Sequence, residues 1–227
     1  MVAGVVGKPY NLETRDRWLV AEFAEPWTVL SWAIVNGGWQ QTVKVAWLFL
    51  KLNELSCRDE PESWMRAQMR AEHLSGAVGF LTTRRAHRWV EAEAEDGACH
   101  AWAIGTVGMS NARRAGDPSD SQVKVGTINQ LVCCSLPLTA EAALEVLALT
   151  SEAKALASVE SGVCSRKSQL PSTGTGTDYL AVAWPGAGSR QKYGGKHTGM
   201  GAAAGRAAYE LVKEGIRIWQ DENPQAG

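Results

Sequence analysis

The sequence predicts a single-domain α/β protein in which a mixed, partly antiparallel β-sheet packs against helices. Three observations predict this fold class. Runs of β-branched, aromatic and other apolar residues alternate along the chain with stretches of helical period. An Asp96-Gly97 pair, which favours a tight hairpin turn, joins an alternating run at 88–95 to an apolar run at 98–107. The chain has 227 residues, 45% of them hydrophobic, which suffices for a sizeable core. We expect one domain over residues 1–227, with 1–20 as a loosely attached N-terminal segment.

The first part of the chain predicts a strand, a helix and a second strand. Residues 27–35 (WTVLSWAIV) are rich in β-branched and aromatic side chains. Asn36-Gly37-Gly38 ends this strand, because Asn and Gly adopt a positive φ at low cost. Residues 61–74 place apolar or small side chains at helical spacing, and residues 76–82 (GAVGFLT) are typical of a buried strand.

The second part of the chain predicts two more strands and two long helices. Thr139 can cap the first helix with its hydroxyl, and Glu141 lies in the first turn, where a carboxylate is favourable. Small residues crowd the start of the second helix, and they allow another backbone to approach closely. The elements are a strand at 123–134, a helix from Thr139 to about residue 159, a strand at 178–184, a glycine-rich connection at 185–196 and a helix at 198–219.

Composition argues against several classes of protein. The formal net charge is −1, so no basic surface for nucleic acid is indicated. No run of 18 apolar residues is present that would span a membrane as a helix. The N-terminal residues lack the basic segment and long apolar core of a signal peptide. We therefore expect a cytoplasmic protein with neither a nucleic-acid partner nor a membrane partner.

Cysteine and tryptophan usage also bears on the class of site. The five cysteines are odd in number and form no C-x-x-C pair, which favours small buried thiols over a disulfide framework or a zinc ribbon. Ten tryptophans are many for this length. Core packing explains most of them, and the alternative is that one or two face a large planar ligand.

Polar, glycine-containing islands lie where a predicted strand meets a loop or a helix, and such positions often carry binding residues. They are residues 36–38, residues 105–117 (GTVGMSNARRAGD), and the pair of turns at 173–178 (TGTGTD) and 193–201 (YGGKHTGMG). The sequence contains no G-x-S-x-G, H-E-x-x-H or P-loop motif, so the familiar serine-hydrolase, zincin and P-loop machinery is missing.

Two side chains in these islands are suited to proton transfer. His197 stands among glycines just before a predicted helix, where it acts as a general acid or base, or only hydrogen-bonds beside a helix cap. Asp178 closes the TGTGTD turn, where it orients a histidine or accepts from local backbone amides. Both interpretations of each residue stay open at this point.

The TGTGTD turn offers hydroxyls and exposed backbone amides. Thr173, Thr175 or Thr177 can act as a nucleophile if a base lies close, and turn formation is the alternative for each. Amides of the neighbouring glycines can form an anion nest, which suits a phosphate or the oxyanion of an acyl transfer. Lys196 is either a solvated surface charge or a contact for an anionic group of a ligand.

Six motifs occur in a definite order along the chain: LSWAIVNGG, the hairpin segment that ends in GTVGMSNARRAGD, GTINQLVCC, TSEAKALA, TGTGTDYLAVA and YGGKHTGMGAAAGRAAYELV. This ordered set resembles the adenosylcobinamide amidohydrolase family, CbiZ. The resemblance covers residues 27–215. It depends on the succession of GTIN, TGTGTD and GKHT rather than on any single motif.

The resemblance implies a hydrolase of coenzyme B12 salvage. Family members hydrolyse the amide that joins the propionyl group of the corrin ring to aminopropanol, giving adenosylcobyric acid and 1-amino-2-propanol. The cobalt belongs to the corrinoid substrate, so the resemblance implies no cofactor and no metal site on the protein. The expected partner is this small molecule, and homo-oligomerisation is left open.

The matched motifs and the chemistry of their residues supply a set of candidate site residues. For catalysis we expect His197, Asp178, Thr175 and Thr177, with the two glycine turns folded together around the scissile carbonyl and the imidazole within reach. Attack by a threonine and attack by a water both stay open. The substrate-binding candidates are Asn36, Gly37, Asn111, Thr127, Asn129, Glu152, Lys196 and Trp184.

Other functions remain as alternatives. The chain can be a non-catalytic carrier of a corrinoid or nucleotide that uses TGTGTD as a phosphate nest, or a metal-dependent hydrolase built from His and Asp residues. Self-cleavage before Thr127 or Thr175, which would expose an N-terminal threonine as nucleophile, is a further alternative.

Overall fold

The computed structural model describes residues 7–51, 54, 60–119 and 126–224. An eight-stranded sheet has the order β4-β3-β2-β10-β8-β6-β5, and β1 pairs with β2 beside this path. Its strands are β1 (Tyr10–Arg15), β2 (Trp18–Ser31), β3 (Gly38–Phe49), β4 (Val78–Thr82), β5 (Val90–Asp96), β6 (Cys99–Val107), β8 (Ile128–Cys134) and β10 (Tyr179–Pro185). The short strands β7 (Ala112–Arg113) and β9 (Gly174–Thr175) form a second, two-stranded sheet.

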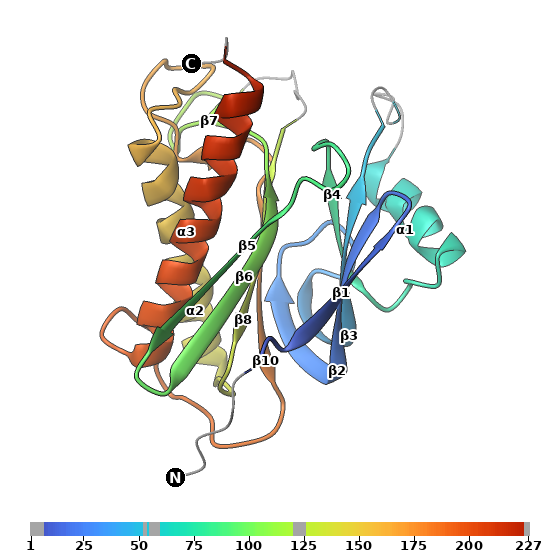
Figure 1. The fold of residues 1–227 in the computed structure, drawn as a ribbon, viewed down its shortest axis with the longest axis vertical. Coiled ribbons are helices and arrows are strands. Elements are labelled where there is room, and N and C mark those ends of the chain that lie inside the picture. The colour runs from blue at the N-terminus through green and yellow to red at the C-terminus, as the bar shows by residue number, and fades with distance from the viewer. Residues whose placement is uncertain (1–6, 52–53, 55–59, 120–125, 225–227) are drawn as a thin grey trace.

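Two long helices cover one face of this sheet. Figure 1 shows α2 (Ala140–Glu160) and α3 (Gly199–Glu222) side by side over β5, β6, β8 and β10. Their small buried side chains, including Ala143, Ala203 and Ala207, pack on Val132 and Val182 of the sheet. Threonine hydroxyls cap both helices, and the sequence predicts the first of these caps, that of Thr139. Thr139 accepts from the amide of Ala142 at 3.3 Å, and Thr198 accepts from the amide of Gly201 at 3.0 Å.

The first half of the sheet bends over the second half. The β2–β3 pairing shifts register between Glu22 and Trp27, and such a bulge bends and twists the strands. As a result the other face of the sheet encloses a second core, in which Trp47 and Phe80 from the first half meet Leu131 and Ala181 from the second half. Helix α1 (Pro61–Ala71) lies outside this bend and buries Met65 and Met69 (Figure 1).

The predicted fold class is confirmed, because β8 pairs with β10 in parallel and the remaining main-sheet pairs, except β3–β4, are antiparallel. The Asp96-Gly97 hairpin is also confirmed, with Gly97 at a φ of 60°. β1 and β3 were not predicted from the sequence. Residues 10–20, expected to be loosely attached, instead pair in the sheet and bury Tyr10 and Trp18.

Two predicted strand boundaries differ from those in the structure. The strand expected at 27–35 corresponds to the second half of β2 and ends at Ser31. A loop follows from Trp32, and within it Asn36 has a φ of 54°. The strand expected at 123–134 starts at Ile128, and its residues 123–125 lie outside the described part of the chain.

No helix in the described part is both long and apolar enough to cross a membrane.

The buried thiols give a prediction. Cys133 and Cys134 are fully buried in β8; burial raises the pKa of both thiols, that of Cys134 to about 12. Cys164 is exposed. In a Cys57→Ser background at pH 8, a thiol reagent is expected to label Cys164 first and Cys133 and Cys134 only after unfolding, since only an accessible thiolate reacts. Peptide mapping of the native protein checks this, and label on Cys133 or Cys134 before unfolding would contradict it.

Candidate functional site

The TGTGTD turn lies at the end of the sheet where β8 and β10 begin. Both strands run in parallel, and Tyr179 pairs with Asn129, so the two motifs that precede them, GTIN and TGTGTD, meet. Gly174 holds a φ of 144°, which L-residues avoid, and lets the turn reverse tightly. A Cβ on Gly174 would stand 2.3 Å from the Asp178 carboxylate and 2.6 Å from Lys154 Nζ, so glycine is required here.

Asp178 is the centre of this site. Its Oδ1 accepts from the Thr175 hydroxyl at 2.6 Å and from the Ile128 amide at 3.0 Å. Its Oδ2 accepts from the Thr175 amide at 3.0 Å and from the Lys154 ammonium. The side chains of Asp178 and Lys154 are only 7% and 12% exposed, so this ion pair is largely shielded from water. With four donors, the carboxylate has used its hydrogen-bonding capacity.

The neighbouring threonine and asparagine side chains connect the two motifs. Thr127 Oγ1 donates to the carbonyl of Thr177 at 2.6 Å and lies 2.8 Å from Asn129 Oδ1. Thr177 Oγ1 donates to the carbonyl of Gly126 at 3.0 Å. Asn111 is buried, and its carbonyl accepts from the amide of Gly176 at 3.2 Å. The sequence-predicted residues Asn111, Thr127, Asn129, Thr175, Thr177 and Asp178 therefore lie together.

The first half of the chain also contributes to this site. Trp32, which follows β2, donates from Nε1 to the main-chain carbonyl of Asp178 at 2.8 Å. Asn129 is fully buried and donates from Nδ2 to the carbonyl of Leu81, at the end of β4, at 2.6 Å. Beside Asp178, burial raises the pKa of the Tyr179 hydroxyl. The bend in the sheet thus brings the end of β4 to the start of β8.

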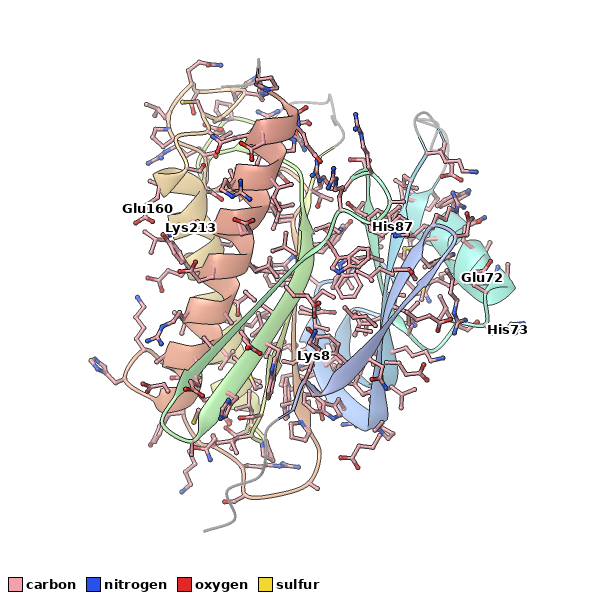
Figure 2. The ribbon with its side chains drawn as sticks, viewed as in Figure 1. Lys8, Glu72, His73, His87, Glu160 and Lys213 are labelled. Carbon is pink, nitrogen blue, oxygen red and sulfur yellow. The ribbon has the colours of Figure 1, made fainter. Side chains whose placement is uncertain are left out.

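His197 lies away from this site. It follows the loop after β10 and immediately precedes α3, whereas Asp178 precedes the first residue of β10. Figure 1 shows β7 near the top of the molecule and the start of α3 at the bottom. The predicted proximity of the His197 imidazole to the TGTGTD turn is therefore wrong, because the length of β10 separates them. Two other histidines, His73 and His87, are exposed and lie on the α1 side of the molecule (Figure 2).

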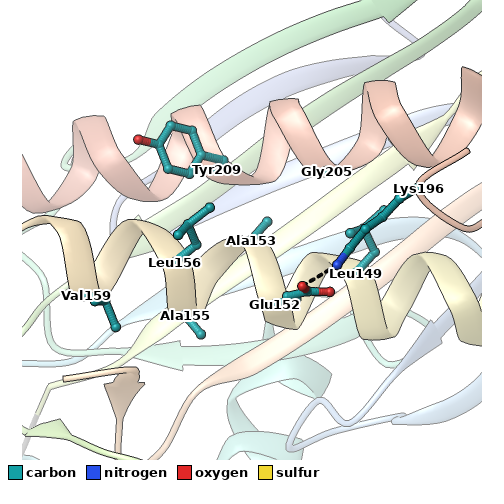
Figure 3. A pocket seen from close by; sticks show the side chains of 9 residues that line it. All are labelled: Leu149, Glu152, Ala153, Ala155, Leu156, Val159, Lys196, Gly205 and Tyr209. Atoms are coloured by element: carbon teal, nitrogen blue, oxygen red, sulfur yellow. Dashed lines mark hydrogen bonds and ion pairs between the residues drawn. The ribbon is translucent and has the colours of Figure 1, made fainter. Parts of the chain in front are cut away.

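Glu152 and Lys196 also lie outside the site. They form an ion pair at one end of a groove between α2 and α3, with a cavity volume of about 470 Å³ (Figure 3). Both side chains are mostly exposed, at 59% and 62%. Apolar side chains, Leu149, Leu156 and Val159 among them, line the rest of the groove. Glu152 points away from Lys154 because two helical positions are about 200° apart around the axis.

Three remaining candidates have structural contacts elsewhere. Asn36 donates from Nδ2 to the carbonyls of Ser75 and Ala77, at 2.9 and 2.7 Å, and ties the β2–β3 loop to the start of β4. A Cβ on Gly37 would stand 2.7 Å from the carbonyl oxygen of Ala33, so this glycine is needed for packing. Trp184 is 4% exposed, and its ring lies under that of Trp39.

Lys154 is the residue to which the sequence analysis gave no role. Its motif, TSEAKALA, was part of the family pattern, and the lysine is the one cationic residue among the small residues of this motif. A lysine flanked by alanines on a helix indicates a buried partner if its side chain faces the core, because an unpaired buried ammonium is costly. Within the described residues, no three His, Cys, Asp or Glu side chains converge as metal ligands would.

The contact between the Thr175 hydroxyl and the Asp178 carboxylate is suited to nucleophilic chemistry. The hydroxyl of Thr175, a half-buried residue, donates to a carboxylate that Lys154 also holds. The amide of Thr177 points to the same hydroxyl oxygen at 3.4 Å. A hydroxyl whose proton has a carboxylate acceptor within hydrogen-bond distance is suited to nucleophilic attack.

The chain matches a family of known proteins. A family model described as adenosylcobinamide amidohydrolase, CbiZ, matches residues 6–224, nearly the whole chain. Among curated proteins, none matches the chain.

Proposed function

The chain belongs to the adenosylcobinamide amidohydrolase family, and on this premise we propose that it hydrolyses the amide between the corrin propionyl group and aminopropanol. The products are adenosylcobyric acid and 1-amino-2-propanol. The cobalt ion enters and leaves as part of the corrinoid. The family match supports an amide hydrolase, and the cluster around Asp178 supplies groups for that reaction.

Thr175 is the proposed nucleophile. Of Thr127, Thr175 and Thr177, only Thr175 donates its hydroxyl hydrogen to a carboxylate, and the other two donate to main-chain carbonyls. This single observation carries the assignment. In the proposed first step, Thr175 Oγ1 bonds to the amide carbon and its proton passes to Asp178. The C–N bond then breaks, and the departing amine takes up the proton from Asp178.

A water completes the cycle. It attacks the ester on Thr175, releases the corrin carboxylic acid and returns the hydroxyl to its first state. Lys154 keeps the Asp178 carboxylate in place throughout and offsets its charge when the proton leaves.

Incubation with adenosylcobinamide tests the proposed function. Mass spectrometry is expected to detect free 1-amino-2-propanol and adenosylcobyric acid, in amounts that rise with time and with protein concentration. Heat-denatured protein serves as the control. Absence of aminopropanol in the presence of folded protein would contradict the proposal. The intact mass of the purified chain, measured alongside, reveals any self-cleavage before Thr127 or Thr175.

A further inference from the structure

Two exposed tryptophans lie on the same sheet face as the Asp178 site. All ten tryptophans are in the described residues, and eight of them are buried or half-buried. Trp32 and Trp39 are the exceptions, with exposed fractions of 45% and 48%. Leaving two large indole rings exposed to water is less favourable than exposing polar side chains at the same positions.

Strand register places both tryptophans relative to the site. Trp39 pairs with Leu30 across β2–β3, and Leu30 pairs with Val182 across β2–β10. Leu30, Val182 and Trp184 all belong to the core beneath α2, so Trp39 extends this face beyond the helix. Asp178 lies four residues before Val182, and its carboxylate meets Lys154 of α2 on this face. A strand spacing of about 4.8 Å and a rise of about 3.3 Å per residue put the Cα atoms of Trp39 and Asp178 roughly 16 Å apart.

Both rings are held in place. Trp32 is fixed by its bond from Nε1 to the Asp178 carbonyl at 2.8 Å, which leaves its ring beside the residue that binds Thr175. Trp39 rests edge-to-face on the buried Trp184, with centroids 5.7 Å apart and planes at 86°. Rigid aromatic surfaces lose little entropy on binding, and they are typical anchors for flat apolar ligands.

We propose that Trp32 and Trp39 form a platform for the flat macrocycle of the corrinoid substrate and so direct its amide side chain to Thr175. This inference rests on the proposed function, which supplies a broad planar ligand as the occupant. The distance from Trp39 to Asp178 is one that a macrocycle and one of its side chains together can span. Trp184 has a supporting role beneath Trp39 rather than a direct contact with the ligand.

Binding of cobyric acid tests the platform separately from hydrolysis, because this probe has the macrocycle without the scissile amide. Absorbance titration is expected to show a dissociation constant about tenfold higher for Trp39→Ala and for Trp32→Ala than for the unchanged protein. Trp39→Phe, which keeps a flat ring, is expected to restore most of the affinity. Trp64→Ala is the matched control, since Trp64 lies on α1 and packs against Arg17. Unchanged affinity in both alanine variants would overturn the platform.

Kinetics with adenosylcobinamide provide a second measurement. A platform that binds the macrocycle equally in substrate and transition state predicts a KM about tenfold higher for Trp39→Ala with kcat unchanged. A fall in kcat with unchanged KM would also overturn it. If the unchanged protein binds cobyric acid through these tryptophans and yet releases no aminopropanol, the proposed function fails and the platform stands. Thermal unfolding of each variant confirms that the fold is intact.

Discussion

Replacing Thr175 with alanine is expected to lower kcat for adenosylcobinamide hydrolysis by at least about 10³-fold while the protein stays folded. The change removes the hydroxyl that donates to Asp178 and leaves the remaining three donors of that carboxylate in place. Loss of one hydrogen bond costs about 1 kcal/mol of the free energy of unfolding, so folding alone cannot explain a large fall in rate. Initial rates and circular dichroism on the same preparation measure both effects.

Two matched variants make this result specific. Thr175→Ser keeps a hydroxyl and is expected to retain measurable turnover. Thr177→Ala removes a hydroxyl that donates only to the carbonyl of Gly126, two positions away in the same turn, and is expected to reduce kcat far less. If Thr175→Ala and the unchanged protein hydrolyse the amide at similar rates, Thr175 is not the nucleophile, and direct attack by water becomes the better mechanism.

The largest loss of stability is expected from removing the Asp178 carboxylate. Asp178→Ala leaves the Lys154 ammonium, which is 12% exposed, without its partner. It also removes the acceptor of the Ile128 and Thr175 amides. Breaking a buried ion pair on one side costs about 3–5 kcal/mol, because the remaining charge is left desolvated. Denaturation with urea measures the free energy of unfolding.

A double-mutant cycle isolates the ion pair from the other effects. Lys154→Met added to Asp178→Ala removes the stranded charge, so the double variant is expected to be more stable than the sum of the two single losses predicts. Glu152→Gln on the same helix is the matched control. Its ion pair with Lys196 is mostly exposed, and such surface pairs contribute about 0–1 kcal/mol. A loss below about 1 kcal/mol for Asp178→Ala would show that the pair does not hold the turn.

The features that sequence analysis predicted correctly depend on local chemistry. The Thr139 cap of α2 and the Asp96-Gly97 turn involve residues within a few positions of one another. The meeting of GTIN with TGTGTD could be anticipated only in part, since their adjacency requires that β8 and β10 be parallel neighbours. Local sequence patterns do not specify which strands become neighbours. The register that places Asn129 beside Tyr179 could therefore not be predicted from the sequence.

The wrong and missing site predictions also arise from contacts between distant elements, which local patterns do not specify. His197 and the TGTGTD turn are close in sequence, but a strand of seven residues, β10, lies between them and carries the chain to the opposite end of the sheet. Trp32 follows the half of β2 that pairs directly with β10, and this pairing joins distant parts of the sequence. Leu81 reaches the site through the bend at Glu22–Trp27, and a bulge of this kind has no clear sequence pattern. Lys154 needed its partner to be interpreted, and that partner lies on another element.

The bond between Trp32 and Asp178 joins residues 146 positions apart. During synthesis, β2 leaves the ribosome long before β10, its neighbour in the finished sheet, so one of its edges stays open while most of the polypeptide is still being made. An unpaired strand edge is a template for association with other chains. The TGTGTD turn is therefore expected to be among the last regions to reach its final contacts, and the nascent chain is expected to be prone to aggregation until β10 is in place.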